Sequence, residues 1–428
     1  MIHTAHKIHP FSADPDFDYE IRCALGRSGG DPGEILSAVA GVRKGDSEGW
    51  YSAWWNLAER TFATAAAAAA GEHRVSAADA YLSAASYYAV AVNAASALKE
   101  SDRLAPAFAR QQEAWRGFIA HVSAKVGVEV EEVGIPYEGR HLTGWFFRAV
   151  PQADAAGTAR AAGATIVAVN GSDGSDASLW SACAAPALER GYNVLIFDGP
   201  GQQSELFERG VPFRPDWEHV LTPVYDFLCS LGDSDSGDNH DGSNGNGGVD
   251  RSRIAVYGIS QGGYWTARAL AFEHRFAAAI TDPGVVDIST SWTSHLPQSL
   301  LRLLDEGEHA KFDREMAFGL KFSAAAARTW QFRARPYGTK GYAETIEAVR
   351  QYNVTDVAGQ ITTPLLILSP EDEQFWPGQA EQLADLTRDV STLVRFTEAE
   401  GAAGHCQPLA RALTAQRMFD WLDERLAR

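Results

Sequence analysis

The sequence has few cysteines and no long hydrophobic run. Its four cysteines, Cys23, Cys183, Cys229 and Cys406, form no Cys-x-x-Cys pair and lack zinc-ligand spacing. This argues against a disulfide framework and against a structural zinc site. No apolar stretch reaches the roughly 18 residues of a membrane helix, and the first residues lack the apolar core of a signal peptide. We therefore expect a cytoplasmic protein with no membrane partner, no metal and no cofactor.

Positive charge is also scarce. Lys and Arg number 37 against 55 Asp and Glu, which gives a formal net charge of −18. Because an acidic surface repels phosphate backbones, nucleic acid is excluded as a partner and a small-molecule substrate is expected. Tryptophan, by contrast, is abundant, with 12 residues. Such rings fill cores, and some line pockets for flat ligands.

Two patterns divide the chain. Residues 1–125 show helical patterns only, with helix starts at Asp31-Pro32 and Ser47 and a capping box at 76–79. Beyond that region, short apolar runs alternate with helix-like segments, which is typical of a mostly parallel sheet covered on both faces. Residues 128–133 alternate with period two, as does the stretch around 145–147 less cleanly, and the apolar runs are 165–169, 194–197, 254–257, 277–280, 365–368 and 393–396. The prediction is a helical region at 1–125 and an α/β core at 126–428.

Two segments interrupt the predicted core. Residues 232–248 contain no aliphatic or aromatic side chain, so we expect a surface loop without a catalytic role. Residues 288–357 are helix-like and lie between two strand-like runs. Insertions of this kind often cover active sites, so this segment is predicted to be a helical cap.

The sharpest motif is Gly258-Ile259-Ser260-Gln261-Gly262. It follows an apolar strand and precedes a helix-like stretch, which is the strand–turn–helix context of a nucleophile elbow. The serine would project at a helix N-terminus, where backbone amides stabilise an anion. The motif predicts Ser260 as a nucleophile and the Gln261 N–H as one oxyanion donor. The loop after 165–169 is expected to supply the second donor, from Gly171 or Ser172.

A serine nucleophile requires a base and an acid, in the chain order serine, acid, histidine. His405 lies in a Gly-rich loop after the last strand-like run, and it is the predicted base. Three carboxylates, Glu371, Asp372 and Glu373, follow the run 365–368. Spacing favours Glu373 as the acid, residue type favours Asp372, and Glu371 ranks third. The sequence does not choose among them.

Four tryptophans are predicted to contact substrate. Trp376 follows the three carboxylates and Trp265 follows the elbow, while Trp180 and Trp292 lie in segments that are expected to reach the cavity. Together they predict a largely apolar, aromatic pocket.

Motifs spread over nearly the whole chain carry a resemblance to a known group. They are 31–34, 137–139, 198–202, 214–218, 258–263, 282–284, 375–378 and 400–405. The chain resembles the α/β-hydrolase subgroup that contains 2,6-dihydroxypseudooxynicotine hydrolase and the fungal hydrolase that shortens a yellowish-green polyketide; the fermentation–respiration switch protein is a more distant relative. This resemblance implies the α/β-hydrolase fold, with an eight-stranded sheet and a cap inserted between strands 6 and 7. It also implies an N-terminal helical region that helps form the cavity and a homodimer.

The chain departs from that subgroup at two points. Gln203 stands where the group commonly has the last glycine of Gly-Pro-Gly-Gln-Gly, and Asn170-Gly171 stands where Gly-Gly is common. We expect the first change to alter a pocket wall.

The resemblance also implies a function. The expected reaction is hydrolysis of a carbon–carbon bond next to a carbonyl, in a polyketide-like or aromatic substrate of secondary metabolism. The alternatives are ester or thioester hydrolysis, elimination of an acyl group such as acetate, and a catalytically dead scaffold. The complete set of serine, histidine and acid argues against the last.

Overall fold

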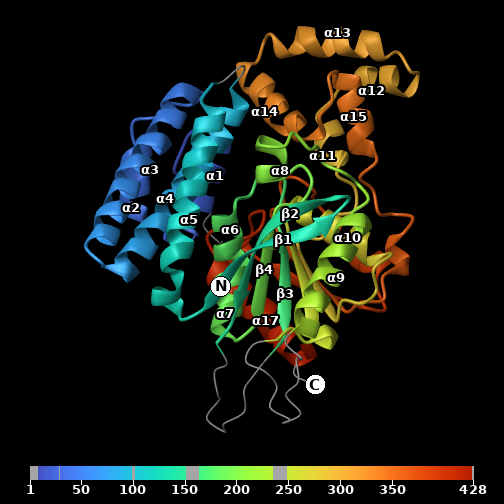
Figure 1. The fold of residues 1–428 in the computed structure, drawn as a ribbon. Helices are drawn as coiled ribbons and strands as arrows, with labels where there is room; N and C mark the ends of the chain where they lie inside the picture. The colour runs from blue at the N-terminus through green and yellow to red at the C-terminus, as the bar shows by residue number, and fades with distance from the viewer. Residues whose placement is uncertain (1–7, 28, 99–101, 151–162, 235–247, 427–428) are drawn as a thin grey trace, which may run out of the picture.

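The computed structural model describes residues 8–27, 29–98, 102–150, 163–234 and 248–426. Its centre is one eight-stranded sheet with the strand order β1-β2-β4-β3-β5-β6-β7-β8 (Figure 1). The pairs β1–β2 and β2–β4 are antiparallel, and the neighbours from β4 to β8 are parallel. The strands are β1 (Glu129–Tyr137), β2 (Arg140–Arg148), β3 (Thr165–Val169), β4 (Asn193–Phe197), β5 (Ile254–Ile259), β6 (Ala278–Asp282), β7 (Leu365–Pro370) and β8 (Ser391–Phe396). The predicted mostly parallel eight-stranded sheet is confirmed.

Helices surround this sheet, and five of them precede β1. The helices are α1 (Pro15–Leu25), α2 (Pro32–Val39), α3 (Ser47–Ala70), α4 (Arg74–Ala97), α5 (Leu104–Val126), α6 (Asp176–Leu179), α7 (Ala185–Glu189), α8 (Gln203–Phe207), α9 (Glu218–Ser234), α10 (Gln261–Leu270), α11 (Thr290–Thr293), α12 (Gln298–Asp305), α13 (His309–Leu320), α14 (Ala324–Ala334), α15 (Tyr342–Arg350), α16 (Gln379–Leu386) and α17 (Arg411–Leu426). Within the described residues, no helix is both long enough and apolar enough to cross a membrane.

Two helix starts differ from the sequence prediction. Helix α4 begins at Arg74, two residues before the predicted capping box, and it has no side-chain cap. Helix α1 was not predicted. It begins where the Asp14 carboxylate accepts hydrogen bonds from the N–H groups of Asp16 and Phe17, with Pro15 in the first turn. Both features favour a helix start, so the short Asp-Pro pair was a usable signal.

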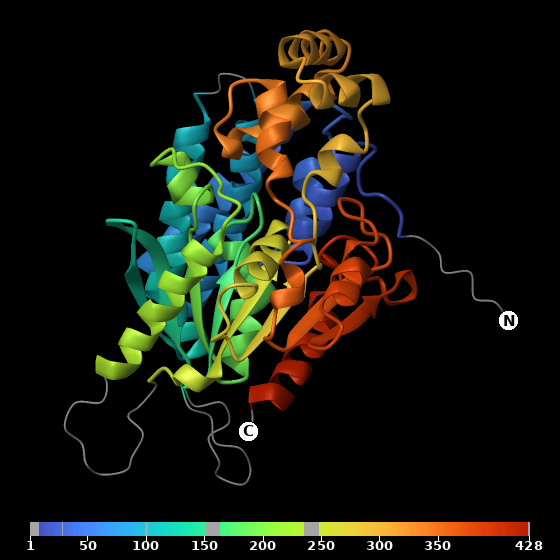
Figure 2. The same cartoon turned by 90° about the vertical axis from the view of Figure 1, so that its right-hand side faces the viewer.

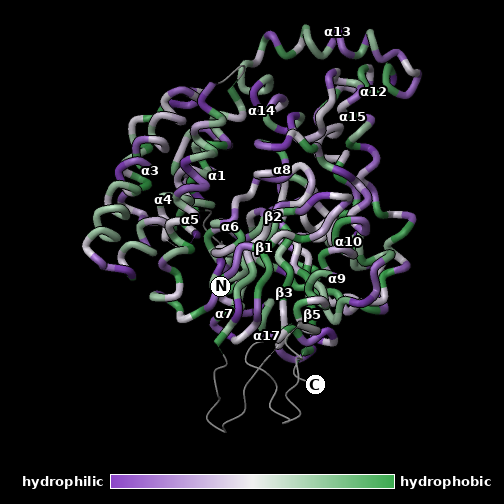
Figure 3. The backbone as a smooth tube through the Cα atoms, in the orientation of Figure 1, coloured by the Kyte–Doolittle hydropathy of each residue, from purple (hydrophilic) through white to green (hydrophobic). Residues whose placement is uncertain are grey.

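The five N-terminal helices share a hydrophobic core with one face of the sheet. Trp115 of α5 packs edge-on against Trp145 of β2, with ring centroids 6.4 Å apart, and Phe118 packs against Trp180 at 4.8 Å. The apolar residues of α7 and α17 join the same core, whereas α9, α10 and α16 cover the opposite face. Figure 3 shows the central strands lined with hydrophobic residues. The helical region is therefore packed against the α/β core through α5.

Helices α11 to α15 form the insertion between β6 and β7, as the sequence predicts, and lie above the sheet in Figure 1. This cap also contacts the N-terminal helices. Arg335 donates a hydrogen bond to the carbonyl of Ser96 (3.0 Å), and Gln331 donates one to the carbonyl of Leu98 (3.3 Å). Figure 2 shows the cap in orange above the sheet. Cap and N-terminal helices thus meet on the side of the sheet where the parallel strands end. Most of the predicted loop 232–248 lies outside the described residues.

Candidate active site

The turn between β5 and α10 holds Ser260 in a strained backbone conformation. Ser260 has φ 57° and ψ −126°, and its N–H donates a short hydrogen bond to the carbonyl of Asp282 (2.6 Å). Its flanking positions have no room for side chains. A Cβ at Gly258 would lie 2.2 Å from the carbonyl oxygen of Gly262, and one at Gly262 would lie 2.8 Å from the carbonyl oxygen of Asn170. Glycine is therefore required on both sides of the serine.

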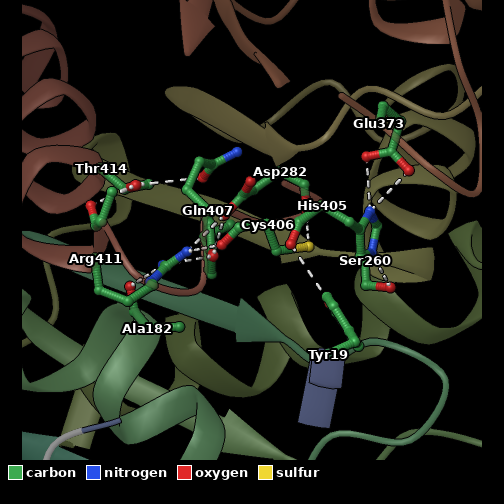
Figure 4. Close-up of polar contacts among 12 residues, drawn as sticks. Tyr19, Ala182, Ser260, Asp282, Glu373, His405, Cys406, Gln407, Arg411 and Thr414 are labelled. Atoms are coloured by element: carbon green, nitrogen blue, oxygen red, sulfur yellow. Dashed lines mark hydrogen bonds and ion pairs between the residues drawn. The ribbon is translucent and has the colours of Figure 1, made fainter. Parts of the chain in front are cut away.

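Ser260, His405 and Glu373 form one hydrogen-bonded line (Figure 4). The His405 Nε2 lies 2.9 Å from the Ser260 Oγ, and the His405 Nδ1 lies 2.7 Å and 3.0 Å from the two carboxylate oxygens of Glu373. Because a carboxylate only accepts, Nδ1 carries the hydrogen and Nε2 accepts from the serine hydroxyl. This geometry prepares the imidazole to take the serine proton.

Glu373 is held as a carboxylate. Burial alone would raise its pKa, but the His405 ring and hydrogen bonds from His405 and from the N–H groups of Phe375 (2.9 Å) and Trp376 (3.2 Å) outweigh burial. The pKa of Glu373 is therefore below its usual value. The side chains of His405 and Glu373 are only 2% and 6% exposed, so water does not compete for their hydrogen bonds.

The other two carboxylates of the predicted acid set point elsewhere. Glu371 is exposed and accepts a hydrogen bond from the N–H of Glu398 (2.8 Å). Asp372 is also exposed, and its backbone N–H donates to the carbonyl of Ala403 (2.9 Å). Asp372 lines a hollow of about 280 Å³ beside the His405 loop, together with Tyr19 and Gly404. Of the three candidates, the structure brings only Glu373 to the histidine.

Two backbone N–H groups remain available for an oxyanion. The loop after β3 passes directly against the serine, since a Cβ at Gly171 would lie 2.8 Å from the Ser260 Cβ. However, the Gly171 N–H donates to the Asn170 Oδ1 (3.0 Å) and so turns to its own neighbour. Gln261 is the first residue of α10, where the N–H has no intrahelical partner. Within the described chain, the N–H of Ser172 has no backbone acceptor. The geometry favours Gln261 and Ser172 over Gly171.

Gln202 braces this loop from behind. Its side-chain amide donates to the carbonyls of Asn170 (2.9 Å) and Gly171 (3.2 Å), and its side-chain oxygen accepts from the N–H of Gly199 (2.9 Å). The next residue, Gln203, has a positive φ of 29°, which favours glycine and accounts for the glycine common at this position in the resembling group. Its side chain is buried and accepts a hydrogen bond from Gln111 of α5 (2.8 Å).

A buried ionic network lies behind His405 (Figure 4). Arg411 of α17 pairs with Asp282 (3.1 Å) and donates to the carbonyl of Cys406 (2.8 Å). The hydroxyl of Tyr257 also donates to Asp282 (3.0 Å). The Asp282 carbonyl accepts from the Cys406 thiol (3.2 Å) as well as from the Ser260 N–H. The network therefore ties the elbow to the histidine loop.

Cys406, next to the histidine, is a packed residue. Burial, followed by the nearby charges of Asp282 and Glu373, raises the pKa of the Cys406 thiol well above its usual value. The thiol therefore stays protonated and is not a nucleophile.

The four predicted tryptophans separate into two groups. Trp376 packs against the His405 ring, with centroids 5.7 Å apart, and Trp292 packs against Tyr337 at the same distance. Trp180 instead packs against Phe118 and Phe147 in the core, and Trp265 stacks on Trp217 at 4.6 Å. Both of the latter side chains are at most 2% exposed and face the core side of their helices. The structure does not bring Trp180 or Trp265 to Ser260.

Helix α1 contributes residues that the sequence analysis missed. The Tyr19 ring contacts His405 and Phe375, and its hydroxyl lies 3.4 Å from the His405 carbonyl. One residue on, burial, followed by the charge of Asp173, raises the pKa of Glu20 to about 7. Asp173 belongs to the loop after β3, where burial also raises its pKa. Helix α1 thus forms one side of the site.

Comparisons with known proteins identify the family of this chain. Residues 166–417 match the family model described as "Alpha/beta hydrolase family". The chain belongs to the α/β hydrolase family and is an enzyme of that family.

Two fungal hydrolases match almost the whole chain. It is 28% identical to hydrolase LUC6 of Fusarium sp over 98% of both chains. It is 27% identical to 20-hydroxy-prefusarin hydrolase FUS2 of Gibberella moniliformis over 98% of this chain and 99% of that one. The crystal structure of 2,6-dihydroxy-pseudo-oxynicotine hydrolase has the same fold, with a TM-score of 0.67 at 20% identity, over 94% of this chain and 95% of that one.

Proposed function

We propose that this protein is a serine hydrolase with Ser260 as nucleophile, His405 as base and Glu373 as the acid that orients the histidine. The observation that carries the proposal is the continuous hydrogen-bonded line from the Ser260 Oγ through His405 to Glu373 at a strained elbow. The backbone N–H groups of Gln261 and Ser172 serve as the oxyanion hole. Glu373, with its lowered pKa, stays ionised and stabilises the imidazolium that forms.

The proposed reaction cleaves a carbon–carbon bond next to a ketone in a polyketide-like or aromatic substrate. His405 takes the serine proton as Oγ attacks the carbonyl carbon, and the oxyanion hole receives the negative charge. Collapse of this adduct breaks the carbon–carbon bond, and the departing carbon keeps the electron pair as an enolate. The enolate takes the proton from the imidazolium. Water, deprotonated by His405, then releases the acyl group from Ser260 as a carboxylic acid.

Ester or thioester hydrolysis is the second candidate, because the same residues serve it with an alkoxide or thiolate as leaving group. The relative named as a 20-hydroxy-prefusarin hydrolase supports a natural-product substrate but does not decide the bond.

A parallel assay tests the proposal. Wild-type protein and Ser260→Ala would be treated with a fluorophosphonate probe and then assayed on benzoylacetone and on 4-nitrophenyl butyrate. We expect labelling and turnover in the wild type and neither in the variant. Labelling that persists in Ser260→Ala would remove Ser260 as nucleophile. Turnover of the ester alone would favour the second candidate.

We also propose that the protein acts on a small molecule as a cytoplasmic homodimer. Light scattering of the full chain tests the dimer, and a single-chain mass at all concentrations would contradict it.

A further inference from the structure

The cap carries a guanidinium whose charge the described residues leave unpaired. Arg333 of α14 lies over the Trp292 ring, 4.6 Å from its centroid, and donates hydrogen bonds to the carbonyl (3.2 Å) and hydroxyl (2.7 Å) of Ser291. Both partners are neutral. The charges of Asp173 and Asp16 act to raise the pKa of Arg333, and neither carboxylate forms a hydrogen bond with it within the described chain. Burial lowers the pKa of Arg333, because desolvation disfavours the charged guanidinium.

Two aromatic rings link Arg333 to the residue that follows Ser260. Trp292, on which it lies, packs against Tyr337, and the Tyr337 hydroxyl lies 3.5 Å from the side-chain amide of Gln261, the residue after the serine. On the other side, the charge of Arg333 acts on the Asp173 region of the oxyanion loop, and Asp173 is in turn coupled to His405. The guanidinium is therefore connected to Gln261 through Trp292 and Tyr337, and it interacts with Asp173 of the loop after β3 through charge.

Arg335 of the same segment donates to the carbonyl of Ser96 and joins the cap to α4, while its buried Nε has no partner within the described residues. Arg333 makes no such hydrogen bond to α4 within the described chain, and its polar contacts are with Ser291. Two of its five N–H groups bond Ser291, and guanidinium N–H groups in such a setting bind anionic oxygens strongly.

We propose that Arg333, held by Trp292 and Ser291, is a substrate-binding residue that takes an anionic oxygen, either the enolate released by carbon–carbon cleavage or a carboxylate carried by the substrate. This deepens the proposed function and rests on it for the role of Ser260. In the cleavage step, the electron pair of the broken bond moves onto the enolate oxygen, and Arg333 donates hydrogen bonds to that oxygen. A neutral ester without such a group gains nothing from Arg333.

A binding experiment tests the anion site without turnover. Benzoate and benzamide have the same shape and differ in charge, and calorimetry would measure both on the full chain. We expect benzoate to bind at least about tenfold more tightly than benzamide to the wild type, and equally to Arg333→Met. Arg333→Lys should keep part of the preference. Arg328→Met, on the same helix, is the matched control and should keep all of it. No preference in the wild type, or a preference that survives in Arg333→Met, would overturn the proposal.

Kinetics distinguishes the two sources of the anion. If the oxygen belongs to the enolate, Arg333→Met lowers kcat on benzoylacetone at least about tenfold, with KM little changed. If it belongs to a carboxylate, the variant raises KM for mono-4-nitrophenyl glutarate and leaves 4-nitrophenyl butyrate unchanged. Equal losses on all three substrates would point to a structural role and contradict the proposal. A benzoate preference without any Ser260-dependent turnover would retain the anion site while removing the proposed function.

Discussion

At the scale of the residue, the sequence left open which carboxylate contacts the histidine. Glu373 contacts the histidine, while Asp372, its neighbour, faces a hollow on the other side of the loop. Glu373→Gln is expected to lower kcat by about a thousandfold, because the amide no longer stabilises the imidazolium. Asp372→Asn should stay within about twofold. Steady-state rates of the two variants, on whichever test substrate turns over, measure the difference, and two equal small losses would refute the assignment.

The raised pKa of Glu20 predicts that the stability of the protein depends on pH. Burial raises its pKa to about 7, whereas the unfolded chain releases this proton near pH 4.5. As pH rises through this window the unfolded state loses the proton first, so Glu20 destabilises the fold increasingly up to about pH 7. Glu20→Gln should therefore stabilise the protein at pH 8, by about 3 kcal/mol at most, and the gain should vanish near pH 4.

Thermal unfolding of wild type and Glu20→Gln across this pH range measures the effect. The exposed residue Glu315 on α13 supplies a control, since Glu315→Gln removes a carboxylate outside the site. A gain from Glu20→Gln that is the same at pH 4 and pH 8 would contradict the raised pKa.

Residue-scale signals explain which parts of the site the sequence could predict. Ser260 and His405 stand in local glycine motifs, and such motifs can be recognised from the sequence alone. The acid was undecided because adjacent side chains on a loop point in different directions, and only the folded loop fixes which one meets the histidine. Tyr19 could not be inferred, since its partner His405 lies 386 residues away.

At the scale of the element, the position of the histidine loop depends on helix α17. Arg411 at its start forms a buried pair with Asp282, whose side chain is fully buried. Arg411→Met leaves that carboxylate without its cation and should cost about 3–5 kcal/mol in unfolding free energy. Adding Asp282→Asn to the same chain removes the stranded charge and should restore part of the loss.

Urea unfolding of the single and double variants measures this coupling. Double-variant stability equal to or below that of Arg411→Met would show that the carboxylate is not the source of the loss. The sequence offered the two residues no pairing signal, because one ends a strand and the other begins a helix far along the chain.

Elements themselves were easier to predict than their ends. The alternating stretches and the apolar runs identified every strand of the described sheet, and the central strands β3 to β7 were clear because a strand buried on both faces is apolar throughout. Helix α4 instead begins two residues before its apparent capping box, and helix α1 was not predicted although Asp14 and Pro15 form a local helix start.

At the scale of the whole molecule, the shared core predicts cooperative unfolding. Residues 1–125 were set apart from 126–428 on sequence pattern, yet Trp115 and Phe118 pack directly on side chains of the α/β core. We expect one calorimetric transition for the full chain. Trp115→Ala should leave a single transition and lower the free energy of unfolding by about 3–5 kcal/mol. Two separate transitions in the wild type would show that the helical region is an independent domain.

The contact of Tyr19 with the His405 loop also has a consequence for synthesis. His405 lies 386 residues after Tyr19, so helix α1 is made well before the histidine loop. At roughly 5–20 residues per second, the first helix waits tens of seconds for its partners on a translating ribosome. A nascent chain that stops before His405 lacks the histidine, so Tyr19 and Ser260 wait for that residue before the site can assemble.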